Sequence, residues 1–310
     1  MKIKSIAATL VLSIAVVTPF SAFANDTKMV TDVSGHQIEI PASPQRVAVA
    51  WDRGITELIT AAGIMPVAVA STDEFAPFLT EALNNLEGIV DLGSHREINL
   101  EALVSAQPDL IVIQDVNNYG NPELFALAQE IAPVVQLNGN KGLRLFIEDF
   151  GAIFGTEYSQ VLNAQVDEAV ARMAAVTPDP SAVSVSNGML LPGTLRLYKD
   201  NSNLASQLMS EAGFGRPDSQ KSGMTEIIND GSEISMEDVG LLDGDILFLG
   251  KIGSDEELSS ITSTDLWKAL PVVERGMVVN ADWRYWNVGG PLAAKHIADD
   301  FVAGFELLNE

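Results

Sequence analysis

Aromatic and arginine side chains gather at two places in this chain, and both places could hold an organic anion. Trp51 and Arg53 follow a short apolar segment, at the point where a strand would give way to a helix. The second group contains Trp283, Arg284 and Trp286, and it is the densest aromatic cluster in a chain with only 6% aromatic residues. A guanidinium can grip two carboxylate or hydroxamate oxygens at once, and an indole ring can pack on a flat organic ligand. The alternatives are a buried core position for Trp51 and coverage of an interface between lobes for the second group.

No catalytic constellation accompanies these groups. The histidines His36, His95 and His296 lie far apart, and none belongs to an H-E-x-x-H pattern. The sequence contains no G-x-S-x-G nucleophile elbow, no P-loop and no G-x-G-x-x-G turn after a strand. We therefore expect a protein that binds a ligand and is not an enzyme. We expect neither a cofactor nor a metal site made of protein ligands.

The first 24 residues have the features of a cleaved signal peptide. A basic start and an apolar stretch precede Ala22-Phe23-Ala24, which is an A-x-A cleavage site. Residues 1–24 are therefore expected to be removed, and the mature chain is expected to begin at Asn25. The apolar stretch is too short for a stable membrane span, so we expect no membrane insertion and a location in the periplasm.

The composition narrows the range of partners. Lys and Arg total 18 and Asp and Glu total 42, which gives a net charge of −24. So acidic a chain lacks the basic face that phosphates require, and no nucleic-acid partner is expected. The absence of cysteine excludes disulfides, thiol catalysis and lipid attachment at a cysteine. An anionic ligand would need locally placed arginines to overcome the repulsion from the negative net charge of the chain.

The elements that must position these residues begin with an α/β lobe over residues 25–142. Short apolar segments at 46–50, 67–70, 110–113 and 134–137 read as strands, and helical stretches at 54–62, 99–106 and 122–131 separate them. Continuous apolar strands alternating with helices indicate a parallel sheet covered on both faces. Residues that directly follow such strands face the ligand cleft of an α/β sheet.

A second lobe is expected over residues 177–310, after connecting helices at 143–176. Gly155 breaks the helical pattern, and Thr156 caps a long helix that should span roughly 30 Å. Further strands are expected at 183–190, 195–198, 245–249 and 277–280. The predicted fold is α/β, with two Rossmann-like lobes that have mainly parallel sheets and are joined by one long helix.

Two N-terminal segments resemble a known family. They are Thr31-Asp32-Val33-Ser34-Gly35-His36 with its continuation to Val49, and Asn99-Leu100-Glu101-Ala102-Leu103 with Pro108 to Ile113. A later segment, Trp267-Lys268-Ala269-Leu270-Pro271, is similar to the family's W-x-x-L-P stretch. The family is that of the class III periplasmic binding proteins, with a helical backbone, which deliver ferric siderophores, haem or cobalamin to ABC importers. The likeness is strongest to binders of hydroxamate siderophores of the ferrichrome type.

The resemblance implies a site in a shallow cleft between the lobes, lined by aromatic residues, an arginine and a tyrosine. The tyrosine corresponds to Tyr119. The arginine corresponds approximately to Arg96, because strict alignment places His95 at that position. Trp286 aligns with an aromatic residue of the family's pocket, and Arg53 and Arg284 are candidates for carboxylates of the ligand. Iron(III) would be coordinated by the siderophore, with no bond from the protein.

Glu123 and Glu237 each stand in the first turn of an expected helix, where the helix dipole favours a negative charge by about 0.3–1 kcal/mol. The resemblance gives this pair another role, since the family uses one exposed glutamate on each lobe to dock on arginine pockets of the permease. The implied function is that of a monomeric periplasmic carrier. It would bind a ferric siderophore of the hydroxamate or citrate–hydroxamate type. It would deliver this ligand to an inner-membrane ABC permease with its ATPase.

Other functions remain open at this stage. Haem binding would need an axial ligand, which Tyr119 or His95 could supply. Cobalamin binding would leave the docking role of the glutamates intact. A periplasmic hydrolase and a purely structural module are further alternatives, and no sequence motif favours either.

Overall fold

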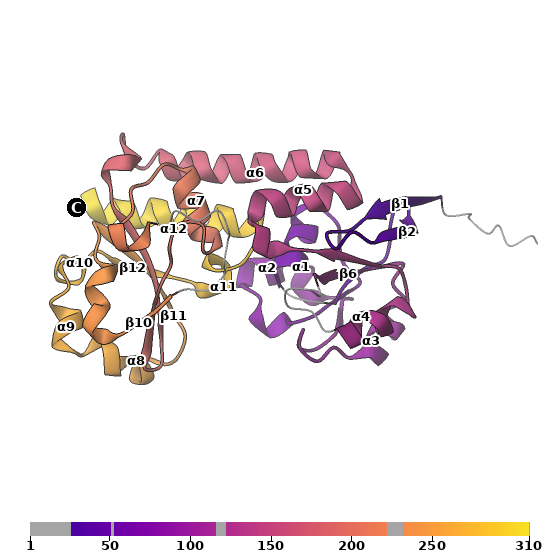
Figure 1. The fold of residues 1–310 in the computed structure, drawn as a ribbon, viewed down its shortest axis with the longest axis horizontal. Coiled ribbons are helices and arrows are strands. Elements are labelled where there is room, and N and C mark those ends of the chain that lie inside the picture. The colour runs from indigo at the N-terminus through magenta and orange to yellow at the C-terminus, as the bar shows by residue number, and fades with distance from the viewer. Residues whose placement is uncertain (1–25, 51–52, 116–121, 222–231, 310) are drawn as a thin grey trace, which may run out of the picture.

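The computed structural model describes residues 26–50, 53–115, 122–221 and 232–309. These residues form two lobes, each built around a five-stranded sheet, and long helices lie across both lobes (Figure 1). The predicted α/β class, with two lobes, mainly parallel sheets and one long joining helix, is confirmed. The predicted signal peptide over residues 1–24 lies outside the described residues.

The sheet of the N-terminal lobe is parallel throughout and has the order β5-β4-β3-β6-β7. Its strands are β3 (Val47–Val49), β4 (Ala68–Val69), β5 (Val90–Asp91), β6 (Leu110–Gln114) and β7 (Val134–Leu137). Strands β3, β6 and β7 are buried along their whole length, as expected for a parallel sheet covered on both faces. The helices of this lobe are α1 (Arg53–Ala61), α2 (Pro77–Ala82), α3 (Leu100–Ser105) and α4 (Pro122–Gln129), with 3₁₀ turns η1 (Thr72–Glu74), η2 (Asn84–Leu86) and η3 (Gly139–Lys141).

An antiparallel hairpin, β1 (Thr27–Thr31) and β2 (Gln37–Pro41), precedes this sheet. Its turn is held by Asp32, which is buried and accepts hydrogen bonds from the backbone N–H groups of Ser34 (3.0 Å) and His36 (2.9 Å). Asp32 also accepts from the side-chain amide of Gln136 on β7 (3.1 Å). One of the two segments that carried the family resemblance therefore ties the hairpin to the edge strand of the sheet.

Two consecutive helices, α5 (Leu143–Phe154) and α6 (Thr156–Ala174), connect the lobes. At 19 residues, α6 is about 28 Å long, and Figure 1 shows it lying along the top of both lobes. Its buried residues recur at helical spacing on one face, and they are Leu162, Val166, Ala169 and Met173. The prediction that Thr156 caps this helix is wrong. Gly155 is the N-cap, and Thr156 is the first helical residue.

The sheet of the C-terminal lobe has the order β10-β9-β8-β11-β12 and is mixed. Its strands are β8 (Val185–Leu191), β9 (Thr194–Leu197), β10 (Ser232–Ile234), β11 (Ile246–Lys251) and β12 (Val278–Ala281). The pairs β8–β11 and β11–β12 are parallel, whereas β8–β9 and β9–β10 are antiparallel. The helices are α7 (Leu204–Glu211), α8 (Asp255–Thr262), α9 (Asp265–Lys268), α10 (Pro271–Glu274), α11 (Trp283–Trp286) and α12 (Pro291–Glu306), with 3₁₀ turns η4 (Pro180–Ala182), η5 (Asp218–Gln220), η6 (Met236–Leu242) and η7 (Leu307–Asn309).

One hydrophobic core runs through both lobes. It includes Val112 on β6, Phe150 on α5, Val166 on α6, Phe248 on β11 and Phe301 on α12. Helix α12 packs along α6 and also reaches α1 of the N-terminal lobe. The lobes are therefore joined by α6 and braced by a second long helix, an arrangement that the sequence did not predict.

The junction between α5 and α6 depends on a glycine. Gly155 has φ 141° and ψ 141°, a conformation that costs residues with a Cβ about 1–3 kcal/mol. We therefore expect Gly155→Ala to lower the free energy of unfolding by that amount, as measured by urea denaturation. The control is Gly240→Ala, because Gly240 has no atom within 4 Å of the added Cβ and its φ is not in the left-handed region. Equal stability of Gly155→Ala and wild type would contradict this account of the junction.

Candidate ligand-binding site

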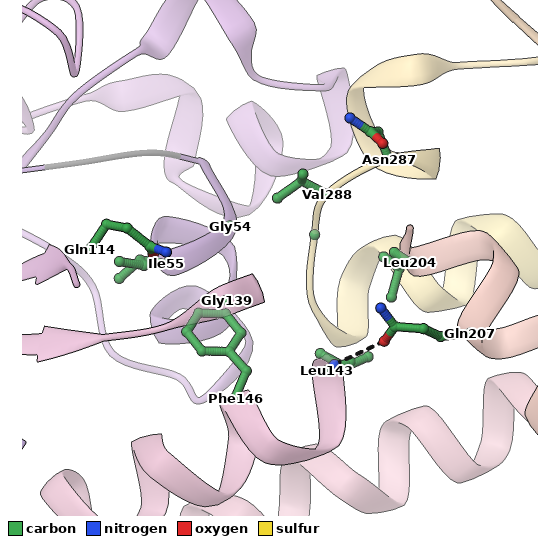
Figure 2. A pocket seen from close by; sticks show the side chains of 11 residues that line it. Gly54, Ile55, Gln114, Gly139, Leu143, Phe146, Leu204, Gln207, Asn287 and Val288 are labelled. Carbon is green, nitrogen blue, oxygen red and sulfur yellow. Dashed lines mark hydrogen bonds between the residues drawn. The ribbon is translucent and has the colours of Figure 1, made fainter. Parts of the chain in front are cut away.

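A hollow of about 480 Å³, including its part open to solvent, lies where the two lobes meet. Figure 2 shows Ile55, Gln114 and Phe146 on one side of it and Leu204 and Asn287 on the other. The complete lining is Gly54, Ile55, Gln114, Gly139, Leu143, Phe146, Leu204, Gln207, Asn287, Val288 and Gly289.

The position of the hollow follows from the sheet of the N-terminal lobe. Gln114 is the last residue of β6, and Gly54 and Ile55 stand in the first turn of α1, which follows β3. In an open α/β sheet, the carboxyl ends of parallel strands face the ligand crevice. Gly139 of η3, the first turns of α5 and α7 and the segment 287–289 complete the wall. Residues remote in sequence therefore meet at one edge of the sheet.

A hydrogen bond ties the two sides of the hollow together. The side-chain oxygen of Gln207 on α7 accepts from the backbone N–H of Leu143 at 3.0 Å (Figure 2). The carboxamides of Gln114, Gln207 and Asn287 are the polar side chains of the lining, and no charged side chain belongs to it within the described residues. Asn287 Oδ1 is buried without a hydrogen-bond partner among these residues, so it can accept from a ligand. The arrangement suits hydrogen bonding and packing.

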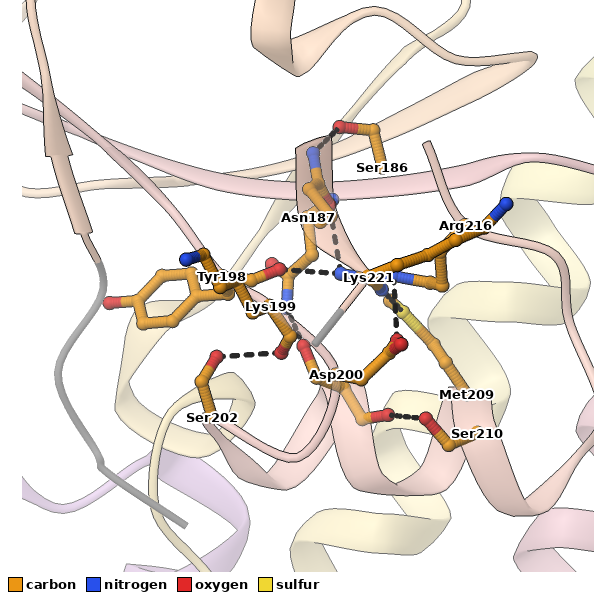
Figure 3. Close-up of polar contacts among 12 residues, drawn as sticks. Ser186, Asn187, Tyr198, Lys199, Asp200, Ser202, Met209, Ser210, Arg216 and Lys221 are labelled. Atoms are coloured by element: carbon orange, nitrogen blue, oxygen red, sulfur yellow. Dashed lines mark hydrogen bonds and ion pairs between the residues drawn. The ribbon is translucent and has the colours of Figure 1, made fainter. Parts of the chain in front are cut away.

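A buried polar network positions α7. Arg216 is 6% exposed, and its guanidinium donates to the backbone oxygen of Tyr198 (2.6 Å) and to Gln220 Oε1 (2.8 Å) (Figure 3). Its Nε lies 3.5 Å from Asp200 Oδ1. Burial lowers the pKa of Arg216 to about 10. Residues 198–200 lead directly into Asn203, which is the N-cap of α7. The network therefore also holds the start of α7, with the lining residues Leu204 and Gln207, in place.

Some of the residues predicted to bind the ligand lie outside the described part of the chain, and others can be placed in the structure. Trp51 and Tyr119 lie outside the described residues, and so does the side chain of Arg53. In the sequence, Trp51 and Arg53 immediately precede the lining residues Gly54 and Ile55, and Tyr119 belongs to the connection that follows Gln114. Their assignment to the ligand stays a prediction.

His95 and Arg96 stand in a turn after β5. The backbone N–H of His95 donates to Ser71 Oγ at 3.1 Å, and its Nδ1 lies 2.7 Å from the same oxygen. Arg96 is exposed, and its guanidinium forms no ion pair or hydrogen bond with any described residue. An arginine in this state can turn toward a ligand without breaking an internal contact with the described part of the chain.

The side chains of α11 differ in burial. Trp283 and Arg284 are half-buried, and the guanidinium of Arg284 forms a forked ion pair with Asp282 (Nε to Oδ1, 2.9 Å; Nε to Oδ2, 3.0 Å). Trp286 is 2% exposed, and its indole N–H donates to Asp300 at 2.6 Å. The ring of Trp286 is therefore part of the core of this structure, and its assignment to the ligand stays a prediction.

The two glutamates assigned to docking are both exposed. Glu123 stands in the first turn of α4 in the N-terminal lobe, and Glu237 stands in the first turn of η6 in the C-terminal lobe. The predicted helix at Glu237 is a 3₁₀ turn. One exposed carboxylate on each lobe is compatible with docking, which stays a prediction.

Sequence reasoning missed four of the polar groups at or beside the hollow, Glu57, Gln114, Gln207 and Asn287. Gln114 had a usable signal, because it is a polar residue directly after the apolar run Leu110–Ile113. The others are ordinary polar residues on helices or loops, and nothing in the local sequence marks them.

An aromatic contact between the lobes carries a pH prediction. His296 on α12 stacks on Phe78 of α2 with ring centroids 4.2 Å apart, and Tyr285, Lys295, Asp299 and Asp300 surround it. Burial, with a smaller effect of Lys295, lowers the pKa of His296 from its ordinary 6.5. Just below pH 6.5, His296 is therefore protonated to a greater extent in the unfolded chain than in the folded one. Because protons bind preferentially to the unfolded chain, the free energy of unfolding decreases as the pH falls through this range.

We therefore expect His296→Phe, which keeps the stacking, to gain stability relative to wild type below pH 6.5 and to show a constant difference above pH 7. Urea denaturation between pH 5 and pH 8 measures this. Parallel pH profiles of the two proteins would contradict it.

Two further features bear on function. Within the described ranges, no group of three or more His, Asp or Glu side chains is arranged to hold a metal ion. In the same part of the chain, no helix has the length and apolar character needed to cross a membrane.

Comparison with known proteins gives consistent matches. The profile of a family described as periplasmic binding protein matches residues 48–285. The probable siderophore-binding lipoprotein YfiY of Bacillus subtilis (strain 168) is 27% identical over 298 residues, which cover 91% of this chain and 89% of that protein. The Fe(3+) dicitrate-binding periplasmic protein FecB of Escherichia coli (strain K12) is 22% identical over 267 residues, 85% of each chain.

Among solved structures, Staphylococcus aureus SirA complexed with staphyloferrin B is similar to this chain, with a TM-score of 0.73 and 22% sequence identity. The match covers 91% of this chain and 99% of that one. This likeness confirms the two-lobed fold.

Proposed function

Because the chain belongs to the periplasmic binding protein family, whose profile matches residues 48–285, we propose that it carries a ferric siderophore to an ABC importer. The observation that carries the proposal is the hollow between the lobes, lined from both sides at the carboxyl edge of the N-terminal sheet. Relatives named for siderophore and ferric dicitrate binding support this class of ligand. The family is one of binding proteins, and the described side chains of the hollow can bind a ligand by hydrogen bonding and packing.

The ligand is a ferric complex of the hydroxamate or citrate–hydroxamate type. Neutral carboxamides at the hollow suit the amide-rich backbone of such a molecule, and the buried acceptor Asn287 Oδ1 would receive one of its donors. Arg96 and Tyr119 contact the oxygens around the iron, and Arg53 and Arg284 face carboxylates of the ligand. Arg284 can do so only in competition with Asp282, since the two side chains are already paired.

The proposed route begins with export. Residues 1–24 direct the chain to the periplasm, where the mature monomer captures the ferric siderophore. Glu123 and Glu237 then engage the inner-membrane permease, whose ATPase supplies the energy for uptake. In this scheme the iron is cargo, held by the siderophore throughout.

Substitution of the two oxygen-contacting residues tests the proposed site. We expect Arg96→Ala and Tyr119→Phe each to weaken ferric siderophore binding about ten- to a hundredfold, because each removes a hydrogen bond to a charged group. Isothermal titration calorimetry measures the affinities. The control is Arg275→Ala, which removes an exposed arginine that donates to the backbone oxygen of Gly244. Unchanged affinity in both site variants would show that the ligand lies elsewhere.

A further inference from the structure

A buried carboxylate crosses the boundary between the lobes. Glu57 on α1 is 3% exposed, and its Oε1 accepts a hydrogen bond from the backbone N–H of Ala293 at 2.7 Å. The two residues are 236 positions apart in sequence. Ala293 stands in the first turn of α12, so the contact links a helix of the N-terminal lobe to the helix that ends the C-terminal lobe.

The start of α12 needs an acceptor from outside the helix. Its N-cap is Gly290, which has no side chain to bond the first N–H groups, and Pro291 has no N–H. The N–H of Ala294 already donates to the backbone oxygen of Gly290 at 2.9 Å. The N–H of Ala293 precedes the first intrahelical bond, and Glu57 takes the place of a capping side chain there. The positive end of the helix dipole also stabilises the negative charge of Glu57.

The backbone around this contact fits tightly against the carboxylate. A Cβ on Gly289 would lie 2.6 Å from Glu57 Oε2, and a Cβ on Gly290 would lie 3.2 Å from Oε1. Glu57 thus holds the chain directly beside Asn287 and Val288, which line the hollow. Its own helix supplies Gly54 and Ile55 to the opposite wall.

We propose that Glu57 is a positioning residue for the ligand: its carboxylate, held by the N-terminal lobe, sets the place of the segment 287–289 at the hollow. This role rests on the proposed function, because it assumes that the ligand lies in this hollow. Glu57 does more than stabilise α12, since a cap within the helix would serve stability without linking the lobes.

Two variants separate positioning from capping. Glu57→Ala removes the link, and the double variant Glu57→Ala with Gly290→Asp supplies a local cap in the space vacated by the glutamate. The double variant also keeps the net charge. Glu57→Gln keeps an acceptor oxygen and covers the case in which the alanine variant does not fold. Glu81→Ala, at an exposed glutamate of α2, is the control.

Residue-resolved amide hydrogen exchange and siderophore affinity are the readouts. The amide of Leu204 donates to the backbone oxygen of Asn287 at 3.1 Å and so reports on the place of the segment 287–289. In Glu57→Ala we expect the amides of Leu204 and Ala293 to exchange at least tenfold faster and the affinity to fall at least tenfold; Glu57→Gln shows the same pattern more weakly. In the double variant, protection at Ala293 returns because the new aspartate accepts its N–H. The amide of Leu204 still exchanges fast, and the affinity stays low.

A double variant that regains both wild-type affinity and slow exchange at Leu204 would overturn the positioning role, because capping alone would then suffice. If the wild-type protein binds none of the siderophores, the proposed function fails. Exchange at Leu204 in the double variant then decides the positioning role by itself, with fast exchange supporting it and slow exchange overturning it.

Discussion

Replacement of Trp286 with alanine is expected to lower the free energy of unfolding by about 3–5 kcal/mol, the range for removal of a large aromatic side chain from a core. The indole is 2% exposed and stacks on Phe248 with ring centroids 4.8 Å apart and on Phe301 at 6.0 Å. The substitution also deprives the half-buried Asp300 of the indole N–H that it accepts at 2.6 Å. Chemical denaturation followed by circular dichroism measures the loss.

Trp283→Ala is the matched control for this prediction, because Trp283 opens the same four-residue helix and is only half-buried. We expect it to cost much less stability than Trp286→Ala and to weaken ligand binding. If Trp286→Ala instead left stability within about 1 kcal/mol of wild type and abolished ligand binding, its ring would belong to the ligand site.

The double variant Glu123→Ala with Glu237→Ala is expected to abolish siderophore-dependent iron uptake and to leave the affinity for the ferric siderophore unchanged. Both carboxylates are exposed, one on each lobe, and neither lines the hollow. Truncation of one member of a hydrogen-bonded charge pair buried in an interface costs about 2–5 kcal/mol. Two such losses would release the carrier from the permease. Uptake of radiolabelled iron by cells with the cognate importer measures the effect.

The control for docking is Glu101→Ala with Glu256→Ala. These exposed glutamates also stand in the first turns of helices, one on each lobe, so the charge and the helix-dipole effects are matched. We expect normal uptake in this control. Loss of ligand binding in the Glu123 and Glu237 variant, with its fold intact, would show that these residues serve the ligand and not the permease.

The parts of the fold that sequence predicts well are the buried strands. The run Leu110–Ile113 is apolar at every position and lies within β6, which is buried along its whole length. The hairpin β1–β2 was not predicted, because half of its strand residues are exposed and its stability depends on Asp32 contacting the distant Gln136. The edge strand β5 has only two residues, too few to give a periodic signal.

The site was harder to predict than the fold. An aromatic cluster looks the same in sequence whether it faces a cleft or a core, and Trp286 proved to be in the core. Gln207 and Glu57 gain their roles only when α7 and α12 approach the N-terminal lobe, a consequence of tertiary packing. The bracing of the lobes by α12 could not be read from the chain, since its contact with α1 joins residues more than two hundred positions apart.

The central claim is that this protein binds a ferric siderophore between its lobes. Titration of the mature protein, followed by tryptophan fluorescence, tests it most directly. The ligands are ferric hydroxamate, citrate–hydroxamate, citrate and catecholate complexes, the iron-free siderophores, haem and cobalamin, each with an absorbance control. The account predicts saturable quenching at submicromolar concentration by a ferric hydroxamate or citrate–hydroxamate complex. Saturation by haem or cobalamin alone, or no saturable response to any ferric siderophore, would contradict it.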